Sequence, residues 1–151
     1  LKYKIQKIDF FRYLAIYTYG GVYLDMDIYL MKSLNDINKN KCVFAVEILE
    51  NTDEILRKQN MKKLLANYAF YAPKKHPFIK KIIDNIVNKR IEIEEDNNKQ
   101  KYVFYTTGPV MVTQSYIDYK NKHEIELLQP KPFKPKHFGK YGKHLRMGSW
   151  K

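Results

Sequence analysis

The feature that most constrains the fold is a double glycine, Gly20-Gly21, which separates a helical pattern from a short apolar stretch. Apolar side chains recur at helical spacing over residues 5–19, and Phe11 lies in the stripe that should face the core. Glycine commonly ends a helix. Because residues 22–24 then form a short apolar stretch that we interpret as a buried strand, the sequence predicts a helix that turns directly into a strand.

Two carboxylates, Asp25 and Asp27, follow the expected strand one residue apart. Alternate residues of an extended chain point the same way, so both could converge on one cation while Met26 faces into the protein. Two converging carboxylates are costly unless a positive charge lies between them. Mg²⁺ or Mn²⁺, shared with substrate phosphates, suits such oxygen ligands. This pair therefore points to nucleotide-sugar chemistry.

The rest of the chain alternates expected strands with expected helices. We expect strands over residues 28–31, 42–48, 68–71 and 124–128, helices over 52–63 and from Pro77 and Pro109, and connections over 89–101 and 129–142. Such alternation is typical of an α/β fold with a mixed, mostly parallel sheet flanked by helices. A length of 151 residues suits one domain over residues 1–151.

Composition restricts the partners of this chain. A formal charge of +12 favours polyanions such as nucleotide diphosphates, nucleic acid or an acidic membrane face, although scattered lysines also occur on solvated helix faces. The lone Cys42 allows no intramolecular disulfide, and no apolar run approaches the ~20 residues of a membrane span. Because Leu1 lies within a helical pattern, we expect an N-terminal part to be missing, which leaves cytoplasm or Golgi membrane open.

A second pair of charged residues precedes the glycines. Asp9 and Arg12 lie three residues apart, hence on one helix face, and neither fits the apolar stripe. That face can lie beside the end of the following strand, where open α/β sheets bind ligands, and its charges could hold sugar hydroxyls. The alternative is a surface ion pair within one helix, worth about 0.2–0.5 kcal/mol. Spacing alone does not decide between them.

Residues 9–27, with the pattern Asp-x-x-Arg before Gly-Gly and Asp-x-Asp, resemble the DXD-containing sugar-binding region of family 32 glycosyltransferases. That family includes yeast-type initiating mannosyltransferases, sphingolipid mannosyltransferases, bacterial capsule enzymes and giant-virus homologues. The resemblance extends from Lys4 to Trp150 through Asn67, His76-Pro77, residues 107–109 and the closing segment 144–150. It implies a GT-A-like sheet whose first nucleotide-binding βα units are missing here.

The resemblance also implies roles for the charged residues. Asp25 would bind the ribose or donor sugar and contribute to the metal site, and Asp27 would hold the metal that bridges the diphosphate. Asp9 and Arg12 would hold the transferred sugar. The implied activity is a metal-dependent hexosyltransferase, with retention, that uses Mn²⁺ or Mg²⁺ and a UDP- or GDP-sugar. The acceptor would be a glycan, lipid or protein, with no nucleic-acid partner.

Four further residues are candidates by resemblance. His144, Ser149 and Trp150 would cap the diphosphate, with His144 a further metal ligand; on its own, such a histidine is more often a core or surface residue. Asn67 is equally well interpreted as a sugar contact or as a turn residue at a strand end.

Two other functions stay open at this point. The charge and the many tyrosines suit a nucleic-acid-binding module, and a truncated chain could be a catalytically silent remnant of a glycosyltransferase.

Overall fold

A computed structural model of the chain describes residues 1–48, 61–93, 98–130 and 136–148. The elements, in chain order, are α1 (Lys4–Tyr19), β1 (Gly21–Leu24), β2 (Ile28–Leu30), β3 (Cys42–Ile48), β4 (Lys63–Ala72), α3 (Pro77–Val87), α4 (Lys99–Thr106), α5 (Pro109–Ile117), a short 3₁₀ helix (Lys122–Glu124), β5 (Ile125–Leu128), β6 (His137–Phe138) and β7 (Gly142–His144). None of the described helices is both long and apolar enough to cross a bilayer.

The main sheet has the strand order β1-β4-β3-β5, which confirms the mixed α/β class. The expected predominance of parallel pairs is wrong, because β1 and β3 both pair antiparallel with β4 and only β3 and β5 are parallel. Antiparallel neighbours need no crossover helix. The helix expected over residues 52–63 lies outside the described residues up to position 60, and β4 already begins at Lys63.

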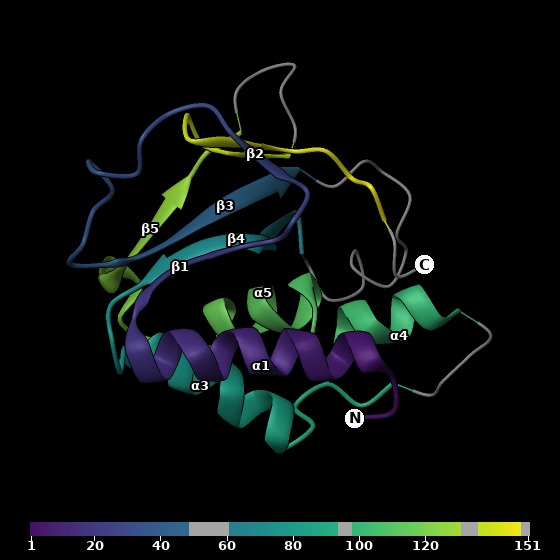
Figure 1. The fold of residues 1–151 in the computed structure, drawn as a ribbon. Helices are drawn as coiled ribbons and strands as arrows, with labels where there is room; N and C mark the ends of the chain where they lie inside the picture. The colour runs from purple at the N-terminus through teal and green to yellow at the C-terminus, as the bar shows by residue number, and fades with distance from the viewer. Residues whose placement is uncertain (49–60, 94–97, 131–135, 149–151) are drawn as a thin grey trace.

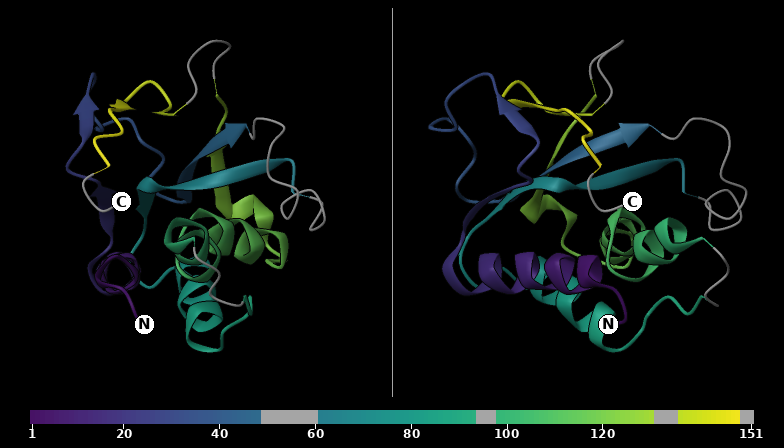
Figure 2. Two further views of the ribbon diagram at one scale, coloured as in Figure 1. Left: turned by 90° about the vertical axis from the view of Figure 1, so that its right-hand side faces the viewer. Right: turned by 45° about the vertical axis from the view of Figure 1, so that its right-hand side comes forward.

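The main sheet separates the two larger hydrophobic clusters of the described residues. Helices α1, α3, α4 and α5 lie together on one side of it, and the second sheet, β2-β7-β6, lies on the other (Figures 1 and 2). Alternation along β3 produces both cores, since successive side chains of a strand point to opposite faces. Phe44 packs among Phe70 and Phe78 on the helix side, whereas Val43 packs with Phe138 below the second sheet.

Gly20 ends α1, as expected from the sequence. Its φ of 70° lies in the left-handed region, and its N–H donates to the Ile16 carbonyl at 2.8 Å. A Cβ at this position would lie 2.7 Å from the Lys74 backbone nitrogen, so only glycine fits. β1 begins at the next residue, and the middle of α1 therefore lies beside the far end of β1.

Some elements differ from the prediction. α4 lies partly in the expected connection 89–101; the Asn98 side chain caps it by accepting the Lys101 N–H at 3.0 Å. The short strands β6 and β7 fall within or at the end of the expected connection 129–142. Phe11, expected in the core, is exposed, because α1 instead buries Gln6, Asp9 and Arg12.

Candidate functional site

The acidic pair lies on a turn and not on an extended strand. β1 ends at Leu24, and the Ile28 N–H donates to the Asp25 carbonyl at 3.0 Å, which closes a four-residue turn. Met26, expected to face inward, is fully exposed at the tip of this turn. The prediction for Met26 is wrong because the alternation of a strand does not continue through a turn. The two carboxylates nonetheless come together.

Strand pairing brings His144 to Asp27. In the second sheet, Ile28 of β2 lies opposite His144 of β7. The Asp27 carbonyl accepts the Leu145 N–H at 2.9 Å, and Asp27 Oδ2 accepts the Met147 N–H at 3.0 Å. His144 Nε2 lies 3.2 Å from the same Oδ2. The segment that follows β7 therefore fixes both the backbone and the side chain of Asp27.

Asp25, Asp27 and His144 together form a candidate metal site. One ligand atom from each lies within 4.8 Å of the others, and all three residues are half-buried. The His144 ring stacks on Tyr68, with the ring centres 4.4 Å apart. Two carboxylates and an imidazole suit Mn²⁺, and the carboxylates suit Mg²⁺. The donor set fits the ion that the sequence predicts.

Arg12 is the buried centre of the site, with only 4% of its surface exposed. Its Nη1 donates to the Asn67 carbonyl at 2.7 Å and lies 3.2 Å from Asp25 Oδ1, and its Nη2 lies 2.8 Å from Asp9 Oδ1. The guanidinium also lies over the Tyr23 ring, 4.4 Å from its centre. Arg12 thus links α1 to β4 and to the end of β1.

Asp9 is equally buried, at 3% exposed. Burial raises its pKa to about 6, against the opposing effects of the Arg12 charge and of a hydrogen bond from Thr107 Oγ1 to Asp9 Oδ2 at 2.8 Å. Asp9 and Arg12 form an ion pair, as the alternative interpretation of the sequence expects. That interpretation is wrong about its location, because the pair is buried and not on the surface. Both side chains are enclosed in this structure, and their contact with a sugar stays a prediction.

Asn67 and two neighbours that sequence reasoning missed complete this network. The Asn67 amide donates to Asp9 Oδ1 at 3.4 Å and to the Tyr13 hydroxyl at 3.3 Å. Tyr23 donates its hydroxyl to Asp25 Oδ1 at 2.7 Å, and burial raises its pKa, so that it stays a donor. Tyr23 lies two residues before Asp25, but a tyrosine in an apolar strand gives no signal of this contact.

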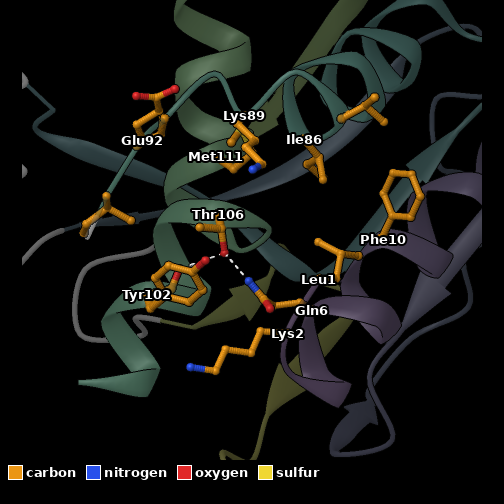
Figure 3. Close-up of a pocket in the computed structure, with 13 residues that line it drawn as sticks. Leu1, Lys2, Gln6, Phe10, Ile86, Lys89, Glu92, Tyr102, Thr106 and Met111 are labelled. Atoms are coloured by element: carbon orange, nitrogen blue, oxygen red, sulfur yellow. Dashed lines mark hydrogen bonds between the residues drawn. The ribbon is translucent and has the colours of Figure 1, made fainter. Parts of the chain in front are cut away.

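The remaining candidates lie elsewhere. Ser149 and Trp150 fall outside the described residues. His76 caps α3 by accepting the Phe78 N–H at Nδ1. A cavity of about 720 Å³ lies between α1, the end of α3 and α4, one helical turn from Asp9 (Figure 3). A hydrogen bond from Gln6 to Thr106 crosses its wall, and the candidate metal ligands do not line it.

Comparison with known proteins gives three findings. The family described as "Glycosyltransferase sugar-binding region containing DXD motif" matches residues 1–44. Over 119 residues, or 78% of this chain, the sequence is 34% identical to inositol phosphoceramide mannosyltransferase 1 of Schizosaccharomyces pombe. The chain spans about a third of that relative's length, since the match covers 32% of it.

The fold is also similar to that of a solved structure, the PaToxG glycosyltransferase. The TM-score is 0.52 at 22% sequence identity, and the match covers 76% of this chain and 34% of the other. At this identity the likeness concerns the fold, and it agrees with the GT-A-like α/β architecture expected from the sequence.

Proposed function

We propose that this chain, which matches the family of glycosyltransferases with a DXD-containing sugar-binding region over residues 1–44 and a yeast mannosyltransferase over 119 residues, transfers a hexose from a nucleotide-diphosphate sugar to a glycan, lipid or protein acceptor. The observation that carries the proposal is the convergence of Asp25 and Asp27, on the turn after β1, with His144 of β7. The yeast relative is named as a mannosyltransferase, which makes GDP-mannose the first donor to test.

We propose that Asp25, Asp27 and His144 hold Mn²⁺ or Mg²⁺. The ion, when bound, would neutralise charge on the diphosphate leaving group. Asp25 Oδ1 already accepts a hydrogen bond from the Tyr23 hydroxyl and lies beside the Arg12 guanidinium. Its second oxygen is therefore the one available to an ion or to a hydroxyl of the donor sugar. Asp27 is held by the Met147 N–H at Oδ2. These contacts fix both carboxylates before any ligand arrives.

Retention is part of the proposal. In such a transfer the bond from the sugar C1 to the diphosphate breaks, a bond from C1 to the acceptor oxygen forms, and the acceptor proton passes to the leaving phosphate oxygen. Asp9 has a pKa near that of a general base, but it is enclosed between Arg12 and Thr107. Asp9 is therefore not an accessible base, which is consistent with transfer of the acceptor proton to the phosphate.

The test measures cleavage of GDP-mannose or UDP-glucose by the purified chain in the presence of Mn²⁺. The quantity measured is the nucleoside diphosphate that is released. Asp27→Asn should abolish release and weaken Mn²⁺ binding measured by calorimetry, because it removes one anionic ligand. Asp84→Asn is the matched control, since Asp84 is an exposed aspartate on α3 that pairs with Lys80. Equal turnover in the wild type and Asp27→Asn would refute the metal assignment.

A further inference from the structure

The second sheet has one face turned to the core and one turned to solvent. Ile28 and its partner His144 point inward, because Ile28 packs in the core below this sheet and His144 stacks on Tyr68. Side chains alternate along a strand, so the next pair, Tyr29 and Lys143, points outward. Both are exposed, Tyr29 to 63%. The outer face therefore carries an aromatic ring beside a lysine.

Three more exposed apolar residues lie beside the candidate metal site. Met26 is fully exposed between the two aspartates, and Leu145 and Met147 are 51% and 75% exposed. The backbone N–H groups of Leu145 and Met147 both donate to Asp27. We define the amphipathic rim as the four exposed apolar residues together with the two exposed basic residues beside them: Met26, Tyr29, Leu145, Met147, Lys143 and Arg146.

Charge indicates what this rim contacts. Single exposed apolar side chains are ordinary, but a group of them around one site marks an interaction surface. Lys143 and Arg146 of the rim are two of the cations that give the chain its net charge of +12. Among the described residues, Asp25 and Asp27, the candidate metal ligands, flank Met26, and Glu47 interacts with His144 and Arg146. Apolar side chains beside basic ones are what an anionic lipid surface binds.

We propose that the amphipathic rim docks this chain on an anionic lipid bilayer, with Met26, Leu145 and Met147 inserted between headgroups and Lys143 and Arg146 against their phosphates. The site would then face the headgroup layer, and the acceptor hydroxyl would come from a lipid headgroup. This last step rests on the proposed function, whereas docking itself requires neither donor nor metal.

The test is co-sedimentation with vesicles of phosphatidylcholine alone or with one quarter phosphatidylserine, at 0.1 M salt. The wild type should bind the anionic vesicles more tightly. Met26→Ser/Leu145→Ser/Met147→Ser should lower the partition coefficient by about tenfold or more. Lys143→Gln/Arg146→Gln should lower it by about 25-fold, from roughly fivefold for each basic residue. Val87→Ser/Ile117→Ser, two exposed apolar residues on helices α3 and α5, is the matched control and should bind as the wild type does.

Three results would overturn the proposal: equal binding of the wild type and the rim variants, equal binding to both kinds of vesicle, or rim-dependent self-association in place of vesicle binding. The last would assign the rim to a second copy of the chain. Asp27→Asn separates docking from catalysis, because it should bind vesicles while losing transfer. Failure of transfer in the wild type with intact vesicle binding would overturn the proposed function and leave the docking surface.

Discussion

Replacing Arg12 by methionine tests the buried network at its centre. Methionine keeps the length of the side chain but leaves Asp9, 3% exposed, without its cationic partner. Removing one partner of a buried ion pair costs about 3–5 kcal/mol, and the Asn67 carbonyl loses a donor worth about 1 kcal/mol. Asp9 can limit this penalty by binding a proton, since its pKa is already about 6. We therefore expect Arg12→Met to lower the free energy of unfolding by about 3 kcal/mol at pH 7.5.

The assay is urea unfolding followed by circular dichroism, with Asp9→Asn and the double variant completing a double-mutant cycle. Asp9→Asn should relieve much of the damage caused by Arg12→Met, because a neutral amide needs no buried cation. We expect a coupling energy of about 2 kcal/mol. The reasoning fails if the two substitutions are additive, or if Arg12→Met costs only the few tenths of a kcal/mol that a surface pair is worth.

Three other perturbations follow from the structure. The free energy of unfolding should depend on pH through Asp9, because its pKa in the folded protein, about 6, exceeds the usual value of 3.8. As the pH rises from 4 to 7, the free energy of unfolding of the wild type, measured with urea, should fall by up to about 3 kcal/mol relative to that of Asp9→Asn. A difference in unfolding free energy between the two proteins that does not change with pH would contradict this. Gly20→Ala should lower the melting temperature more than Gly21→Ala. Both glycines have positive φ, but of these two only Gly20 would place a Cβ within 3 Å of backbone, so equal shifts would contradict the close approach. Mn²⁺ at about 100 times its Kd should stabilise the wild type by about 2.7 kcal/mol, and EDTA should reverse this stabilisation. Asp27→Asn should gain far less stability from Mn²⁺. Melting curves of the wild type that are the same with and without Mn²⁺ would count against the site.

Elements with a local signal could be predicted from the sequence. The glycine at the end of α1, the apolar run of β3 and the proline that opens α3 fix their elements through nearby residues. Strand direction has no such signal, because it depends on how β4 meets two strands that are distant in the sequence. Helix α4 also lacks a local signal in the sequence, because it is rich in Lys and Tyr and has little apolar periodicity.

The candidate site could be predicted in part. The acidic pair was identified, but through an extended geometry that the turn after Leu24 replaces. His144 could be connected to Asp27 only by family resemblance, since their contact depends on the register of β2 against β7. Thr107 belongs to one of the segments that carry the family resemblance, but no sequence signal indicates that its hydroxyl donates to Asp9. Contacts between residues distant in the sequence need the fold before they can be seen.

Helix α1 shows where the rules of sequence patterning fail and why. It buries Gln6, Asp9 and Arg12 together with the apolar residues Tyr13 and Ile16, while Ile8 and Phe11 are exposed, which departs from the pattern of an ordinary surface helix. Such a departure costs stability, because buried polar groups must all be paired and apolar groups remain in water. Natural chains break these rules mainly where function requires it. The buried polar residues of α1 reach Asp25 through Arg12, so the candidate site accounts for this polar part of the buried face, whereas Tyr13 and Ile16 belong to the core.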